Sequence, residues 1–209
     1  TARVSAYPIN KVWDGTQRSA AQTETAYFAT ADIDKPTDVK IHIDGDFNNY
    51  DIRSHAAKLC HSRDGNDITV HVEKPCQFTV EPNGMHNALH VFINPVSRRP
   101  DKDNIVYYGA GRHEAGLIWL ESGSELYIDE GAIVHGVIYA KDAQNIKIHG
   151  RGIIDSSDYA RGNDKNGNHE IIEQLRKKGI TEDFHETGIV CSNLILYNCK
   201  NVTVEGITL

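Results

Sequence analysis

Two pairs of nearby side chains have the residue types needed for acid–base chemistry. His113 is followed directly by Glu114, and Asp155 lies three positions before Asp158 in the stretch GIIDSSDYARG. An imidazole beside a carboxylate can act as a base with the group that orients it, but consecutive side chains of a strand point to opposite faces. We therefore expect structural or capping roles for His113 and Glu114. Acidic residues where a strand ends commonly satisfy the backbone of a turn, and contact with ligand hydroxyl groups is the alternative for Asp155 and Asp158.

A polar segment, 156–188, follows the first of these aspartates. Its centre, NHEIIEQLRKKG, predicts a short helix, with Asn168 as the N-cap and Gly179 as the residue that ends it. Long loops on a rigid scaffold often bind ligands. With Asp155 and Asp158, the side chains that we expect to reach a substrate are Tyr159, Arg161, His169, His185 and Glu186. Taken singly, each is more typical of a solvated surface group.

The elements that precede this segment begin with short strands. Stretches such as DVKIHID, DITVHVE and ALHVFIN alternate apolar and polar residues, and turn formers such as Asp64-Gly65-Asn66 separate them. Alternation of period two with frequent turns is typical of an antiparallel sandwich, because one face of each strand is buried and the other is wet. We predict a β-sandwich domain over residues 1–98 and a linker over 99–104, where prolines and mixed charges continue neither helix nor sheet.

The pattern changes from residue 105 to residue 209. Strand-length apolar segments follow one another too closely for helices between them, which excludes a doubly wound α/β fold. Aligning Leu126 with Ile146 and Val202 gives offsets of 20 and 56 residues, the second enlarged by the loop 156–188. Such self-similarity is typical of a parallel solenoid. Asn145 and Asn201 then occupy the same corner of successive coils, where left-handed backbone and stacked amides suit asparagine.

Composition limits the partners. With 29 acidic and 22 basic residues the net charge is −7, which argues against nucleic-acid binding. The chain has no run near the ~18 apolar residues that cross a membrane, so we expect no membrane partner. We also expect no metal and no cofactor, because no CxxC or His-Cys cluster has metal-binding spacing. A hairpin between Cys60 and Cys76 could join them in a disulfide, or both could be free.

The stretches GLIWLESGSELYIDEGAIVHGVIYAKDAQNIKIHGRGIIDSS and CKNVTVEGITL resemble the early coils of the polygalacturonase-like glycoside hydrolases. The resemblance covers about residues 105–209, and it implies the first coils of a right-handed parallel β-helix. A β-sandwich before such a helix is similar to the arrangement of the dextranase and isopullulanase family. The fold class that we predict is therefore all-β, with an N-terminal antiparallel β-sandwich followed by the start of a parallel β-helix.

The resemblance implies the N-terminal part of an inverting glycoside hydrolase that acts on a polysaccharide or oligosaccharide. In that family the catalytic carboxylates lie on later coils, so we expect them beyond residue 209 and expect these 209 residues alone to be inactive. The alternatives are a non-catalytic carbohydrate-binding or attachment module and a β-helix polysaccharide lyase. We also expect C-terminal coils or a partner chain to cap the open end of the solenoid. A first residue Thr1 in place of Met suggests that a signal peptide or an artificial segment was removed. The resemblance implies a secreted or periplasmic location.

Overall fold

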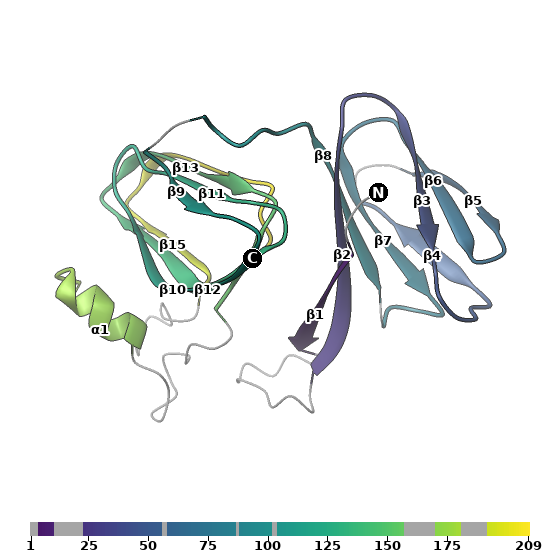
Figure 1. Ribbon diagram of the computed structural model, residues 1–209, viewed down its shortest axis with the longest axis horizontal. Helices are drawn as coiled ribbons and strands as arrows, with labels where there is room; N and C mark the ends of the chain where they lie inside the picture. Colours follow the sequence, from purple (N-terminus) through teal and green to yellow (C-terminus); the bar gives the residue numbers. More distant parts are fainter. Residues whose placement is uncertain are drawn as a thin grey trace. The chain divides into compact units, whose positions relative to one another are not determined.

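The computed structural model describes residues 4–10, 23–55, 58–86, 88–101, 104–156, 170–180 and 192–209 (Figure 1). The chain divides into two compact units, and the boundary between them along the sequence lies between Arg98 and Arg99. Strands in several sheets dominate both units, and the described residues include one helix. The prediction of an all-β chain is confirmed.

The N-terminal unit contains two sheets. The larger has the order β1-β2-β8-β7-β4, and all its neighbours are antiparallel except β2 and β8. The smaller sheet is antiparallel and has the order β3-β6-β5. The strands are β1 Val4–Asn10, β2 Thr23–Ile33, β3 Thr37–His42, β4 Tyr50–Arg53, β5 Cys60–Asp64, β6 Asp67–Val72, β7 Cys76–Pro82 and β8 Leu89–Pro95.

The two sheets of this unit share one hydrophobic core. In β6, every second residue is buried, namely Ile68, Val70 and Val72. They pack in the same cluster as Phe78 of β7 and Val91 of β8 in the other sheet. The alternation of apolar and polar residues in the sequence therefore corresponds to one buried and one wet face.

The disulfide hypothesis for Cys60 and Cys76 is wrong. The hairpin is formed by β5 and β6, and it places Cys60 opposite His71. Cys76 belongs to the other sheet, where it lies opposite Ile93. Both cysteines are free, and Cys60 is exposed.

The C-terminal unit contains two parallel sheets, and the chain passes alternately from one to the other. The first sheet has the order β16-β13-β11-β9, and in the second β12 lies between β10 and both β14 and β15. Each strand thus pairs with strands from the preceding or following passage. The strands are β9 Val106–Tyr108, β10 Gly111–Leu120, β11 Glu125–Ile128, β12 Ala132–Lys141, β13 Gln144–Gly150, β14 Ile153–Asp155, β15 Leu194–Tyr197 and β16 Lys200–Glu205.

The register confirms the 56-residue offset and corrects the 20-residue one. Ile146 pairs with Val202, as aligned in the sequence. Leu126, however, pairs with Ile148 and not with Ile146. The error is two residues, and a shift of two leaves every side chain on the same face of the sheet, so the apolar pattern fits both registers. An offset of 20 does occur in the other parallel sheet, where Ile118 pairs with Ile138.

The corner asparagines behave as the sequence predicts. Asn145 and Asn201 have φ values of 61° and 52°, and the Asn201 amide donates to Oδ1 of Asn145 over 2.6 Å. The same arrangement recurs at a neighbouring corner, where Asn198 donates to Asp142 over 2.5 Å and both have positive φ. These side-chain bonds connect successive passages of the chain in addition to the backbone bonds of the sheets.

Helix α1, Glu170–Lys177, covers part of the second parallel sheet. Leu175 and Ile171 of the helix are buried against Val137 and Tyr139 of β12. Gly179, two residues after the end of the helix, has a left-handed backbone with a φ of 79°. The amide of Ile180 donates to the carbonyl of Leu175, and that of Gly179 donates to Arg176. This is the pair of bonds of a Schellman motif, and it confirms the predicted helix end.

The segment that carries α1 interrupts one strand position of the sheet. β14 pairs with Ile133–His135 of β12, whereas β15 pairs with Ile138–Lys141 of the same strand. The two short strands are thus the two halves of one rung. The chain leaves the sheet after Asp155 and returns to it at Leu194.

Candidate functional site

Of the seven residues predicted to bind substrate, the structure describes Asp155. It is the last residue of β14, directly before the chain leaves the sheet, and its side chain is largely buried. The other six, Asp158, Tyr159, Arg161, His169, His185 and Glu186, lie outside the described residues.

Asp155 lies beside a buried histidine on the outer face of the second parallel sheet. The register pairs it with His135 of β12, and Oδ2 of Asp155 is 3.5 Å from Nδ1 of His135. The side chains are 9 % and 3 % exposed. Because ionisable groups are rarely buried without partners, this pair is the first candidate for a functional site.

Arg112 of β10 completes the group. Its Nη2 lies 2.6 Å from Nε2 of His135. A guanidinium can only donate hydrogen bonds, so Nε2 of the imidazole must accept and the ring proton is assigned to Nδ1, the nitrogen that faces Asp155. His135 thus lies between a cation and a carboxylate. We call Arg112, His135 and Asp155 the RHD cluster.

Two polar side chains next to the RHD cluster are hydrogen-bonded to each other where the interrupting segment begins and ends. Ser156 follows β14 and Asn193 precedes β15. The hydroxyl of Ser156 donates to Oδ1 of Asn193, and the Asn193 amide donates to the carbonyl of Ile154 over 3.2 Å. The two ends of the segment are therefore joined beside Asp155.

His113 and Glu114 do not form a pair. Nε2 of His113 donates to the carbonyl of Gly109 over 2.6 Å, and its ring contacts Tyr108 edge to face at 5.3 Å. Glu114 is exposed and is the register partner of His135. These contacts are of the kind expected for a structural role of His113, and Glu114 adds a carboxylate to the strand position next to the RHD cluster.

The RHD cluster is suited to binding and not to acid–base catalysis. Nε2 of His135 is occupied by Arg112, so it takes no proton from a ligand while that bond exists. Arg112 is exposed, and a guanidinium has five N–H donors, of which His135 uses one. A pre-oriented, exposed guanidinium binds oxygen acceptors such as hydroxyl, carboxylate or phosphate groups.

A second buried histidine lies in the other parallel sheet. Nε2 of His149 donates to Oε1 of Glu125 over 3.0 Å, and its ring contacts Tyr127 at 4.9 Å. Burial lowers the pKa of His149, and the positive charge of Lys147 lowers it further, whereas Glu125 opposes this shift. His149 is therefore a buried neutral histidine near neutral pH.

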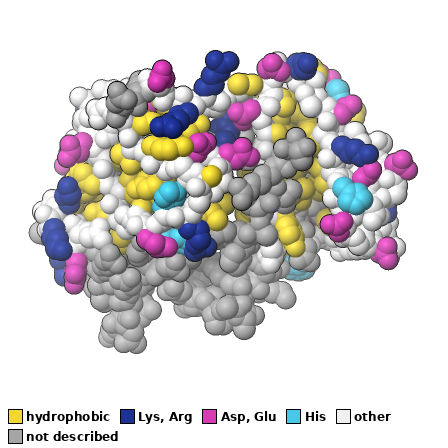
Figure 2. Space-filling model, viewed as in Figure 1, with side chains coloured by type: hydrophobic (Ala, Val, Ile, Leu, Met, Phe, Trp, Pro, Cys, Tyr) yellow, Lys and Arg dark blue, Asp and Glu magenta, His cyan; other side chains and the backbone are white. Residues whose placement is uncertain are grey.

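The described residues contain no candidate metal centre, and the face shown in Figure 2 carries charges of both signs. Within the described ranges, no three His, Cys, Asp or Glu side chains converge to hold a metal ion. In the view of Figure 2, acidic and basic side chains are intermixed, and neither sign forms a continuous patch on that face. Among the described residues, no helix is both long and apolar enough to cross a membrane.

Sequence reasoning missed Arg112 and His135, although a signal for one of them was present. His135 precedes Asp155 by 20 positions, which is the repeat offset. Applying that offset to polar residues as well as to apolar ones would have placed the two side by side. Arg112 contacts His135 from a diagonal strand position, next to the irregularity in register between Glu114 and Gly116, so no fixed offset would have found it.

Comparison with known proteins yields a fold-level likeness. No protein-family model matches the chain, and no curated protein matches it. Among solved structures, the chain is similar to Dex49A from Penicillium minioluteum, with a TM-score of 0.51 and 16 % sequence identity. The match covers 87 % of this chain and 43 % of Dex49A, so the chain spans less than half the length of that protein. At this level of identity the likeness is one of fold.

Proposed function

We propose that this chain is the N-terminal part of an inverting glycoside hydrolase that acts on a polysaccharide. The observation that carries the proposal is the likeness to the dextranase Dex49A, which extends over 87 % of the chain. The likeness concerns the fold, and folds of this type host several chemistries.

The arrangement of the sheets supports the finer fold assignment within this proposal. The two N-terminal sheets share a core of apolar side chains, as the layers of a β-sandwich do. In the second unit, the two parallel sheets enclose another core, which includes Ile118, Ile138, Leu126 and Ile148. We assign these parts as a β-sandwich and the first coils of a right-handed parallel β-helix.

The RHD cluster gives this chain a role in substrate binding within the proposal. Arg112 can donate to sugar hydroxyl or carboxylate oxygens, while His135 and Asp155 hold its guanidinium in place. Inverting hydrolysis also needs a carboxylic acid and a carboxylate about 6.5–9.5 Å apart. We place that pair beyond residue 209, so the present chain binds the polysaccharide without cleaving it.

The last strands of the two parallel sheets carry exposed apolar side chains, which support the proposal that further structure covers them. β16 and β15 are outermost strands, and several of their apolar side chains are exposed. Tyr197 is 52 % exposed, and Leu209 is 55 % exposed. We propose that further coils of the same protein or a partner chain cover these groups, since solenoid ends are normally capped.

Binding by the 209-residue chain can be measured by affinity electrophoresis in gels that contain dextran or polygalacturonate. We expect retardation by one of them, and we expect Arg112→Ala to weaken it about tenfold, the value of one charge-assisted hydrogen bond. Arg176→Ala is the matched control, because Arg176 is an exposed arginine in the last turn of α1. If both variants were retarded equally, Arg112 would not contribute to polysaccharide binding, and the RHD cluster would not be the binding site.

Catalysis requires a form of the protein that extends beyond Leu209. We expect this longer protein to hydrolyse the bound polysaccharide, and proton NMR of the first product to show the inverted anomer. Binding without cleavage would instead identify a non-catalytic carbohydrate-binding module. Release of unsaturated sugars, detected by their ultraviolet absorbance, would identify a lyase.

A further inference from the structure

The smaller sheet of the N-terminal unit ends at a strand with one open edge. Among the described strands, β3 pairs with β6 alone. The facing sheet extends further, because β2 and β1 follow β8 in its order. Val39 and Ile41 of β3 share a core with Val91 and Ile93 of β8, so β3 lies over β8. The position opposite β2 is therefore not occupied by a strand of the smaller sheet.

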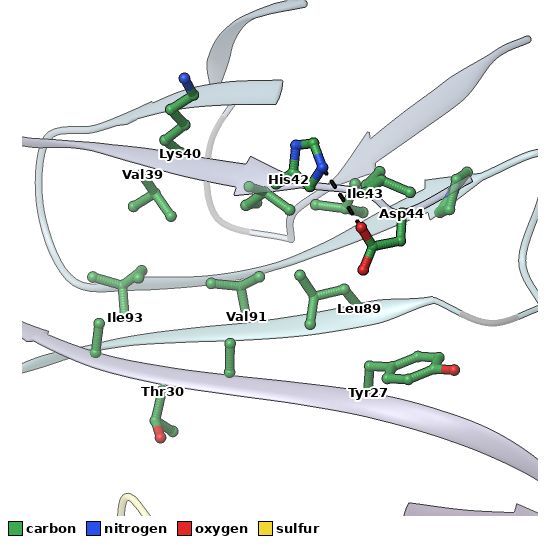
Figure 3. A pocket seen from close by; sticks show the side chains of 15 residues that line it. Tyr27, Thr30, Val39, Lys40, His42, Ile43, Asp44, Leu89, Val91 and Ile93 are labelled. Atoms are coloured by element: carbon green, nitrogen blue, oxygen red, sulfur yellow. Dashed lines mark ion pairs between the residues drawn. The ribbon is translucent and has the colours of Figure 1, made fainter. Parts of the chain in front are cut away.

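A cavity of about 690 Å³ lies at this position. Its floor is formed by β2 and β8, where Ala29 and Ala31 pair with Val91 and Ile93 and share their face of the sheet. Figure 3 shows Val39 directed toward Ile93 and Val91, whereas the side chain of Lys40 points away from them. The cavity is thus a groove whose floor is formed by apolar side chains, among them the small side chains of two alanines.

The wall of the groove is the backbone edge of β3. The lining includes all residues from 39 to 44, although side chains of alternate residues point to opposite sides. The amide of Ile43 donates to the carbonyl of Asn66, which continues the register with β6. Because hydrogen-bonded residues alternate along an antiparallel strand, the N–H and C=O groups of Lys40 and His42 point toward the groove.

We propose that this groove binds an extended segment of another polypeptide, which adds a strand to β3. The segment has small apolar residues at alternate positions that face Ala29 and Val91, and its backbone bonds to Lys40 and His42. Edge strands with open backbone groups bind peptides in this way. The inference does not depend on the glycosidase proposal, because it concerns the other unit of the chain.

The size of the groove agrees with this occupant. A residue in a stacked sheet fills about 160 Å³, from a rise of about 3.4 Å, a strand spacing of about 4.8 Å and a sheet spacing of about 10 Å. The cavity therefore holds about four residues of a strand. A second copy does not fit, because pairing β3 with its own equivalent in one continuous sheet would place β2 of each copy where β8 of the other copy lies. A small apolar molecule would leave the backbone groups of Lys40 and His42 without partners.

The test uses the 209-residue protein and a fluorescein-labelled peptide of alternating valine and threonine. We expect saturable binding by fluorescence anisotropy, with NMR amide shifts concentrated in residues 39–44 and in β2 and β8. His42→Pro removes the outward N–H of an edge strand, which such strands tolerate. His42→Ala is the matched control, because it removes the same contacts of the His42 side chain with Asp44 and Asp67 and keeps the N–H.

We expect His42→Pro to bind about two- to twelve-fold more weakly than His42→Ala, which is the range for one net hydrogen bond. Thermal melts of both variants verify that they are folded. Two further peptides test the same bonds from the other side. Each is N-methylated at alternate residues, one at the amides that face β3 and the other at the amides that face away from it. The first peptide should bind the protein more weakly than the second. Equal binding of the two peptides, equal binding of the two variants, or no binding by the wild-type protein would each overturn the proposal.

Discussion

Substitution of Gly150 by alanine tests how the chain passes from one parallel sheet to the other. It ends β13 with a φ of 130°, and a Cβ added there would lie 1.9 Å from the carbonyl oxygen of Ile128. That oxygen accepts the amides of Arg151 at 2.8 Å and of Gly152 at 3.0 Å. The carbonyl therefore cannot move away from an added methyl group without losing two hydrogen bonds of the turn.

We expect Gly150→Ala to reduce the free energy of unfolding by about 2–6 kcal/mol. Strained backbone contributes about 1–3 kcal/mol, and two hydrogen bonds contribute about 0.5–1.5 kcal/mol each. Because domains are stable by only about 5–15 kcal/mol, the upper part of this range would leave the C-terminal unit largely unfolded at room temperature. Urea unfolding, followed by the fluorescence of Trp119 in β10, measures the loss.

Gly123→Ala is the matched control for this prediction. Gly123 has a φ of 81°, but a Cβ there would meet nothing within 4 Å. This variant carries the backbone strain without the clash, so it should lose only about 1–3 kcal/mol. If Gly150→Ala were no more destabilising than Gly123→Ala, the close approach between β13 and the Ile128 carbonyl would be refuted.

Three more outcomes are expected from the same urea assay. Asn201→Ala should cost about 1–3 kcal/mol, since it combines strained φ with a lost bond to Asn145; Asn201→Gly should cost less, and equal costs would contradict the strain argument. Leu175→Ala should cost about 2–5 kcal/mol, the usual loss for a buried leucine, and a cost below about 1 kcal/mol would mean that α1 unfolds independently. The lowered pKa of His149 means that unfolding takes up a proton below the unfolded-state value of about 6.5, so stability should fall as the pH drops below that value. Stability should therefore fall less steeply with decreasing pH in His149→Asn than in the wild-type protein, and identical slopes in the two proteins would exclude His149 as the cause.

Much of the fold was accessible from periodicity alone. Strands of period two, the 56-residue offset and the asparagine corners all correspond to features of the structure. Gly179 also ends α1 as expected, because a left-handed residue after a basic last turn is a strong local signal. These features depend on short-range geometry, which the order of residue types encodes directly.

The parts that sequence reasoning missed depend on exact register. A two-residue error in the pairing of Leu126 preserved the apolar pattern and was therefore invisible. Cys60 and Cys76 looked like the two ends of one hairpin, but the chain changes sheets between β6 and β7. The RHD cluster likewise joins three strands, and its contact between Arg112 and His135 crosses an irregular pairing.

The division of one rung into β14 and β15 has a consequence for how such a protein can change over evolutionary time. Each half keeps its own hydrogen bonds to β12, and Ser156 and Asn193 hold the two cut ends together. Apart from α1, whose apolar side chains pack against β12, residues between these ends can thus be lengthened, shortened or exchanged without altering the pairing of the strands. New recognition elements would always emerge at the same place, beside Asp155, so this position is a natural point at which to graft foreign loops.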